Sequence, residues 1–312
     1  MKIAWRILIP FPPRRHARLQ ILLGSLLLST GCLTDKNQAG TKHPDWMEWR
    51  AKRHESIAGT NGWITIVARQ WLNEGPSKAG SDPTNQVVLP GDRAAPFVGT
   101  FVRTGRHVRF EAAADVRATL DGQMTQVAHL VSDASNAPTH LHIGSLSFVV
   151  IERGDRLGVR VRDSEARARK EFRGLTYFSY ADHWRIEGSF ETFPAIQTLR
   201  VGDVTGGTQD LLSPGMLVFK YRGEEYRLQT AIEPGEEDLF VIFRDQTAGD
   251  STYGSGRFLY VPRPAPNQRV VIDFNRAYTP PCGFTPFATC PLPPRQNWLP
   301  FAVKAGERKP IH

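Results

Sequence analysis

Hydrophobic residues in this chain come mostly in short runs separated by turn-forming residues, a pattern typical of β-strands joined by tight turns. One segment has helical spacing instead, because Trp46 and Trp49, and likewise Arg50 and Arg53, are three positions apart, and this predicts a short helix over 44–59. The pair Asp121-Gly122 favours a tight turn. In the first half, the pattern predicts strands at 62–67, 87–89, 99–102, 107–110, 116–120, 141–151 and 158–162.

The second half repeats the β-pattern, with Pro214-Gly215 expected to break a strand and Arg222-Gly223 expected to close a hairpin. The predicted strands are 184–190, 196–201, 216–221, 226–230, 239–243, 257–261 and 270–274. An aromatic linker at 175–178 is expected to pack between the halves. We therefore expect a mostly β protein of two β-rich modules with a short N-terminal helix. Residues 44–175 would form a β-sandwich, and residues 176–312 a β-sandwich or partly open barrel with a Pro-rich loop.

The first residues have the form of an export signal. Residues 1–31 carry basic side chains, then an apolar run too short to span a membrane as a helix, then small residues before Cys32. This segment resembles the lipobox of bacterial lipoproteins, although Ser29 stands where that motif usually has Leu. The resemblance implies acylation of Cys32, a tether at 32–43 and, since Leu33 follows, the periplasmic face of the outer membrane. An ordinary cleaved signal with an incidental cysteine remains the alternative.

The net charge changes once this leader is set aside. The whole chain carries +8, but the leader contributes five basic residues and no acidic one, so 34 basic residues face 31 acidic ones in the remainder. Such a weakly basic body has little means to neutralise phosphates, and nucleic acid is not an expected partner. The 27 glycines and 23 prolines agree with many turns. No phosphate loop, dinucleotide motif or Gly-x-Ser-x-Gly elbow occurs, and no cofactor is expected.

The best candidate for chemistry is a group of polar and glycine residues near strand ends in the C-terminal half. Two glycines around Ser255 favour a bend that presents backbone N–H groups to an anion, Arg257 can bind a carboxylate or phosphate, and Asp245 or Asp273 can serve as a base. The competing interpretation makes the same residues caps and ion pairs. The candidate ligand-binding residues are Asp245, Thr247, Tyr253, Gly254, Gly256, Arg257, Asp273, Asn275 and Tyr278.

The remaining chemistry-bearing residues are fewer. Cys282 and Cys290 lie eight positions apart in a Pro-rich loop, and outside the cytoplasm we expect them to form a disulfide; a redox pair or metal site is the alternative. His140 and His142 share one face of a predicted strand, but no third metal ligand is near in the sequence, so no metal is expected. The four early tryptophans, Trp46, Trp49, Trp63 and Trp71, are interpreted as core residues rather than a sugar or lipid groove.

Several segments together resemble a bacterial family called domain of unknown function 1684. They are Gly62-Trp63, 71–75, 80–85, 153–160, 252–259, 273–282, 287–293 and 305–307, and the likeness spans about residues 46–308. This resemblance implies no activity. The first half also resembles forkhead-associated (FHA) domains at Gly80-Ser81-Asp82-Pro83, but Ser81 stands where those domains place the phosphate-binding Arg, so at most the scaffold is shared.

The sequence therefore predicts a membrane-anchored envelope lipoprotein that binds a small polar or anionic ligand, or an envelope partner, at the junction of its modules near Arg257 and Asp273. One alternative is a small hydrolase that uses Asp245 or Asp273 with Arg257, and whether the chain is an enzyme is left open. Another is a structural spacer without a pocket. Geometry discriminates between them, because an enzyme needs an acid, Arg257 and Tyr253 to converge in an open cleft.

Overall fold

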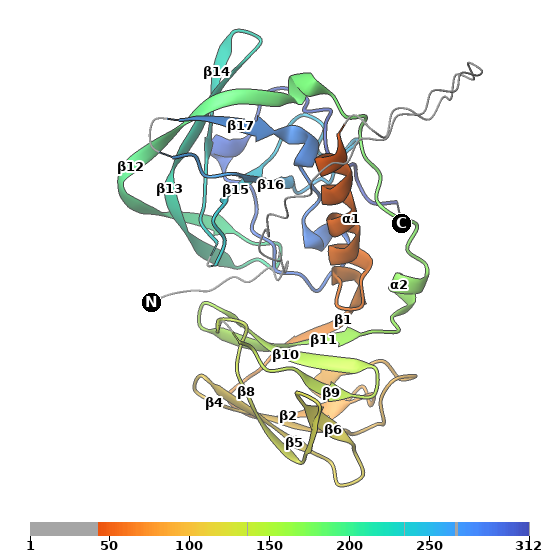
Figure 1. Ribbon diagram of the computed structural model, residues 1–312. Helices are drawn as coiled ribbons and strands as arrows, with labels where there is room; N and C mark the ends of the chain where they lie inside the picture. The colour runs from red at the N-terminus through yellow and green to blue at the C-terminus, as the bar shows by residue number, and fades with distance from the viewer. Residues whose placement is uncertain (1–42, 136, 234, 266–267, 312) are drawn as a thin grey trace, which may run out of the picture.

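The computed structural model describes residues 43–135, 137–233, 235–265 and 268–311 (Figure 1). The predicted fold class is confirmed, since 45% of the described residues are strand and 13% are helix. Cys32 and most of the predicted tether lie outside the described residues. Among the residues described, no helix combines the length and the apolar character needed to cross a bilayer.

The first module is built from two sheets that enclose one core. Phe101, Phe110 and Phe148 meet at its centre with ring centroids 4.7–6.5 Å apart, and Phe148 comes from the sheet opposite the other two. One sheet has the order β1-β11-β10-β9-β6-β7 and the other β3-β2-β4-β5-β8. Their strands are β1 (Ile66–Trp71), β2 (Gly75–Gly80), β3 (Val87–Val88), β4 (Gly99–Thr104), β5 (His107–Ala112), β6 (Ala118–Leu120), β7 (Gln123–Thr125), β8 (Val127–Leu130), β9 (Leu141–Ile143), β10 (Leu146–Arg153) and β11 (Arg156–Asp163).

The second module curves a four-stranded sheet, β14-β13-β12-β17, around the short pair β15-β16 (Figure 1). Leu217 and Phe219 from the sheet pack against Leu239 and Val241 from the pair, which closes a second core. The elements are β12 (Arg185–Gly202), β13 (Thr208–Tyr221), β14 (Glu224–Gln229), β15 (Leu239–Phe243), β16 (Arg257–Val261) and β17 (Arg269–Asp273). Short helical pieces are α2 (Arg167–Lys170), η2 (Trp63–Thr65), η3 (Asp182–Trp184), η4 (Phe274–Arg276), η5 (Pro281–Gly283) and η6 (Arg295–Asn297).

Two strands of the second module are longer than predicted. The segments 184–190 and 196–201 belong to the single strand β12, and β13 runs through Pro214-Gly215 without a break. The pairing of β12 with β13 shifts register between Thr192 and Gln197, and such an irregularity lets a sheet accept a residue that lacks an N–H. A Cβ on Gly215 would lie 2.1 Å from the Glu191 carbonyl oxygen, so glycine serves here to allow close strand contact.

The predicted strand at 62–67 was wrong in its first half. Residues Trp63–Thr65 form a 3₁₀ turn, and β1 begins only at Ile66. Sequence analysis also missed β2, whose residues Gly75–Gly80 are mostly small or polar. Three of its residues, Ser77, Ala79 and Gly80, are buried between neighbouring strands, so tertiary packing and not local propensity makes this segment a strand.

The N-terminal helix α1 (Pro44–Ala58) forms as predicted and lies along the C-terminal module rather than on the β-sandwich that follows it (Figure 1). Arg53 pairs with buried Glu307 at 3.0 Å and donates to the Thr279 carbonyl at 2.6 Å. The predicted linker contributes Tyr177, whose ring packs edge-on against Trp46 and Trp49. These two tryptophans therefore fasten the helix and the linker to the second module and are only half-buried.

Candidate functional site

Arg257 and Asp245 are the centre of the predicted ligand-binding group, and they form a closed ion pair. Arg257 is 1% exposed, and its Nη2 lies 2.7 Å from Asp245 Oδ2 and 2.9 Å from the Val303 carbonyl. The other carboxylate oxygen, Asp245 Oδ1, accepts from the Thr247 N–H and hydroxyl and from the Val303 N–H. Every acceptor position of this carboxylate is used internally, so the pair holds the C-terminal segment in place.

The other predicted residues do not converge on Arg257 in an open cleft. Asp273 caps the turn η4 by accepting from the Asn275 N–H at 3.1 Å, and the Tyr253 hydroxyl donates to the Cys282 carbonyl at 3.1 Å. Gly256 has φ +92°, and a Cβ there would meet the Phe243 carbonyl oxygen at 2.5 Å. Gly254 accepts from Arg244 through its carbonyl, and Tyr278 is buried. This geometry matches the caps and ion pairs of the competing interpretation and gives no support to a hydrolase.

The predicted disulfide is absent, because Cys282 and Cys290 are both free thiols. They are neighbours, and the Cys282 N–H donates to Cys290 Sγ at 3.2 Å. The loop that carries them is held by the first module instead, since Arg69 donates to the Ala288 carbonyl at 2.9 Å and Arg153 to the Thr289 hydroxyl at 3.3 Å. Within the described residues, no group of three metal-ligating side chains occurs.

A cavity of about 30 Å³ lies where the two modules meet, and none of the nine predicted residues lines it. By the rule that one water needs roughly 10–15 Å³ of such space, it has room for about two or three water-sized groups. The first module contributes Trp63, Arg153 and Arg160, and the second supplies the opposite wall. The second module's lining residues are Gln209, Leu211, Glu233, Phe240, Phe258, Pro281, Thr289, Cys290 and Pro291.

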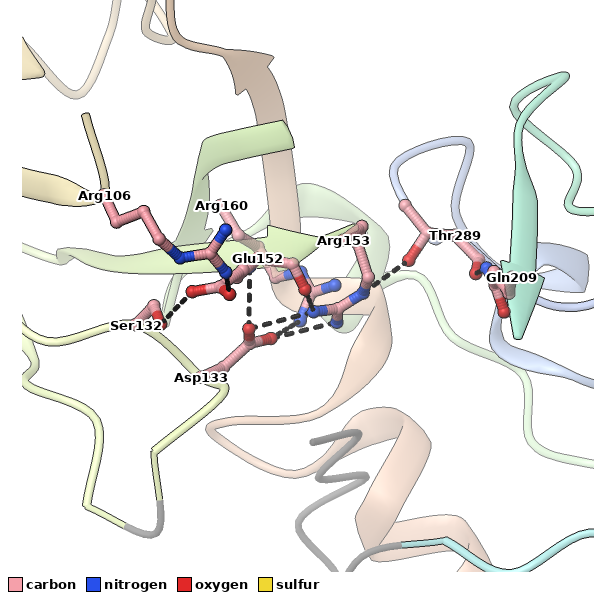
Figure 2. Close-up of polar contacts among 8 residues, drawn as sticks. All are labelled: Arg106, Ser132, Asp133, Glu152, Arg153, Arg160, Gln209 and Thr289. Atoms are coloured by element: carbon pink, nitrogen blue, oxygen red, sulfur yellow. Dashed lines mark hydrogen bonds and ion pairs between the residues drawn. The ribbon is translucent and has the colours of Figure 1, made fainter. Parts of the chain in front are cut away.

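Arg153, at the end of β10, has its guanidinium fixed by Asp133. Its Nη1 and Nη2 each lie 2.9 Å from a different oxygen of Asp133, a two-pronged geometry that fixes both side chains (Figure 2). Asp133 also accepts from the Glu152 N–H at 2.9 Å. Arg153 therefore contributes charge to the cavity while its hydrogen-bonding groups are committed to protein partners.

Arg160 on β11 differs because most of its guanidinium is not paired. It is 6% exposed, and its nearest carboxylate contact is a 4.0 Å approach of Nη1 to Asp133 Oδ2, the carboxylate that Arg153 already holds. Neither Nε nor Nη2 has a hydrogen-bond partner among the residues that the structure describes. Burial, and next the charge of Arg153, lowers the pKa of Arg160 to about 9, so the side chain is still cationic at neutral pH.

Acceptor groups stand on the opposite wall. Gln209 donates its Nε2 to the Thr289 carbonyl at 2.8 Å, and its Oε1 is buried without a partner among the described residues. Glu233 is fully enclosed and accepts a hydrogen bond from the Tyr260 hydroxyl. Burial raises the pKa of Glu233 to about 7, so this carboxyl is partly protonated near neutral pH and cancels only part of the charge of Arg160.

Sequence analysis missed this site. The alternation of apolar and basic residues in Gly158–Arg162 was visible, but alternation on a strand usually marks a solvent-exposed face. Here the second module covers that face, and Arg160 becomes buried. No local pattern shows which face of a strand another module will cover.

Residues 170–308 match the family model described as "Protein of unknown function (DUF1684)", a shorter span than the sequence resemblance indicated. An uncharacterized protein of Haloarcula marismortui, solved by NMR, is 32% identical, with 45% of this chain and 78% of that chain covered and a TM-score of 0.39. The FHA-2 domain of the Mycobacterium tuberculosis ABC transporter Rv1747 is 16% identical, with 46% of this chain and 96% of that one covered and a TM-score of 0.23. No curated protein matches the chain.

Proposed function

We propose a function from the geometry of the cavity, because the description of the DUF1684 model that residues 170–308 match assigns no activity. The protein is a lipid-anchored envelope protein that binds a small anion between its two modules, and Arg160 is the residue that holds the anion. The observation that carries this proposal is the buried guanidinium edge of Arg160, where two N–H groups lack acceptors within the part of the chain that the structure describes.

The charges around the cavity favour an anion over water alone. The carboxylate nearest to Arg160 is that of Asp133, which Arg153 already binds through two nitrogens, and Glu233 is only partly ionised at neutral pH. Each buried donor left without a partner costs about 1–3 kcal/mol, and a buried cation without a counter-charge costs more. An anion in the cavity would supply both the acceptors and the opposite charge, whereas water would supply only the acceptors.

The proposed location depends on the leader and not on the described residues. A basic start, a short apolar run and Cys32 support acylation and attachment to the periplasmic face of the outer membrane. Labelled palmitate should enter the wild-type protein and not the Cys32→Ala variant. Equal labelling of the two proteins would refute the lipid anchor at Cys32, and the proposal that the cavity binds an anion would be unaffected.

Anion binding is tested by thermal unfolding. The reference buffer contains the salt of a sulfonate that is too bulky for the cavity, and this salt is replaced stepwise by chloride or formate so that the ionic strength stays constant. An anion at about a hundred times its Kd stabilises the folded state by roughly 2.7 kcal/mol, which should raise Tm by about 5–10 °C. Arg160→Gln should abolish that rise. Arg162→Gln is the matched control, since Arg162 lies two positions along the same strand but does not line the cavity. An equal rise in both variants, or none in the wild type, would refute the proposal.

A further inference from the structure

The part of Arg160 that is left free defines the shape of the anion. In a guanidinium group, Nε–H and one N–H of Nη2 point the same way along one edge, while Nη1 lies on the other side. Arg160 turns Nη1 toward Asp133 and leaves Nε and Nη2 without partners among the described residues. This is the edge that binds two oxygen atoms of one planar group at once, as in arginine–carboxylate pairs. A spherical ion such as chloride uses this edge poorly.

The opposite wall adds a second requirement. Gln209 is anchored through Nε2, which bonds to the Thr289 carbonyl at 2.8 Å, so its amide cannot turn without losing that bond. Its buried Oε1 is an acceptor without a partner among the described residues. A ligand that only accepts hydrogen bonds would satisfy Arg160 and leave this oxygen unpaired, which carries the usual cost of a buried polar atom. A ligand with an O–H group satisfies both walls.

The size of the cavity limits the choice further. With space for about two or three water-sized groups, the cavity admits a ligand of three or four non-hydrogen atoms and excludes phosphate esters and amino acids. The positive charge of Arg160, whose nearest carboxylate is already bound by Arg153, calls for at most a single negative charge on the ligand. From the free edge of Arg160, the unpaired oxygen of Gln209 and the volume of the cavity, we infer that the cavity binds a small planar oxyanion with one O–H group, of which hydrogen carbonate is the simplest example. This inference rests on the proposed anion-binding function.

The test compares four sodium salts on the wild-type protein in closed vessels at pH 7.5: hydrogen carbonate, formate, nitrate and chloride. Dissociation constants come from the rise of Tm with concentration. The three planar anions should bind more tightly than chloride, and hydrogen carbonate should bind roughly five- to tenfold more tightly than formate, the effect expected of one additional hydrogen bond. Equal affinity of hydrogen carbonate and formate, or chloride binding as tightly as either, would overturn the inference and leave the broader proposal intact. Failure of all four anions would overturn both.

Two variants assign the preference to its residues. Arg160→Lys keeps the positive charge but loses the two-pronged edge, so the planar anions should lose their advantage over chloride. Gln209→Met keeps a similar volume without the acceptor, so hydrogen carbonate should fall to the affinity of formate while formate binding changes little. An unchanged ranking in a folded Gln209→Met protein would contradict the role of Oε1. If that variant does not fold, the four-anion ranking of the wild type still decides the question.

Discussion

Replacement of Glu233 by glutamine gives a quantitative prediction about the wall opposite Arg160. Glu233 is fully enclosed, and its carboxylate accepts from the Tyr260 hydroxyl. Burial is the largest cause of its raised pKa, and the nearby negative charge of Glu236 adds to it. Glutamine has almost the same shape and can still accept from Tyr260, but it cannot ionise. The substitution therefore removes the titration and keeps the packing.

The magnitude follows from the difference between the two states. The pKa is about 7 in the folded protein and 4.5 in an unperturbed glutamate, so the folded state binds the proton more tightly. The stabilisation that results is fully present below pH 4.5 and is lost as the pH rises through 7. The shift corresponds to about 3 kcal/mol in all, and most of it falls between pH 5 and 8.5.

The assay is urea unfolding, followed by tryptophan fluorescence, at several pH values from 5 to 8.5. The free energy of unfolding of the wild type should fall by roughly 2–3 kcal/mol more than that of Glu233→Gln over this range. Glu224→Gln, at an exposed position on β14, is the matched control and should follow the wild type. Parallel curves for wild type and Glu233→Gln would refute the reasoning, because the carboxyl would then have no raised pKa in the folded state.

Three further outcomes follow from the same contacts. The affinity for formate, measured from Tm, should be weaker at pH 8 than at pH 6, because ionised Glu233 repels the anion, and Glu233→Gln should lose much less affinity, only the small part that follows from the pKa of Arg160 near 9. Arg257→Met should lower the free energy of unfolding by about 3–5 kcal/mol by leaving Asp245 buried without its partner, and a loss below 1 kcal/mol in urea unfolding would contradict the closed pair. Gly256→Ala should lower the free energy of unfolding by about 2 kcal/mol or more in the same assay, because a Cβ would meet the Phe243 carbonyl. Gly254→Ala is the control, since the atom nearest to its Cβ would be 3.8 Å away, and it should change that free energy by no more than about 0.5 kcal/mol. Equal losses of stability in the two variants would disprove the steric argument.

The sequence was sufficient to predict the turns and the helix that are stabilised by interactions between residues close together in the chain. The Asp121-Gly122 and Arg222-Gly223 turns both use positive φ at consecutive residues, as the tight turns of hairpins require, and the hairpin formed by β13 and β14 was predicted correctly. The helix 44–58 was predicted from its spacing and its initial proline. In each case the deciding interactions lie within a few residues of the chain.

The misses share one cause, which is that the deciding contact comes from a distant segment. Pro214-Gly215 resembles a break, yet an irregularity in the partner strand β12 accommodates it. From the sequence, Arg257 was interpreted as a ligand-binding residue, but in the structure Asp245 and the carbonyls of Val303 and Ala305 bind its guanidinium. The alternating pattern around Arg160 is typical of a solvent-exposed strand face, but in the structure the second module covers that face and buries Arg160. Residue type indicated the chemistry in both cases, and only the packing of the modules decided which of the two arginines has both Nε and Nη2 without partners among the described residues.

The central claim is that the free edge of Arg160 binds a planar anion, and a crystal structure of the protein grown with hydrogen carbonate tests it most directly. The account predicts flat, three-lobed density between the modules, with two lobes within hydrogen-bond distance of Nε and Nη2 of Arg160 and the third near Oε1 of Gln209. The same density should disappear from crystals of Arg160→Lys. Separate spherical waters in the wild-type cavity, unchanged in the variant, would contradict the account.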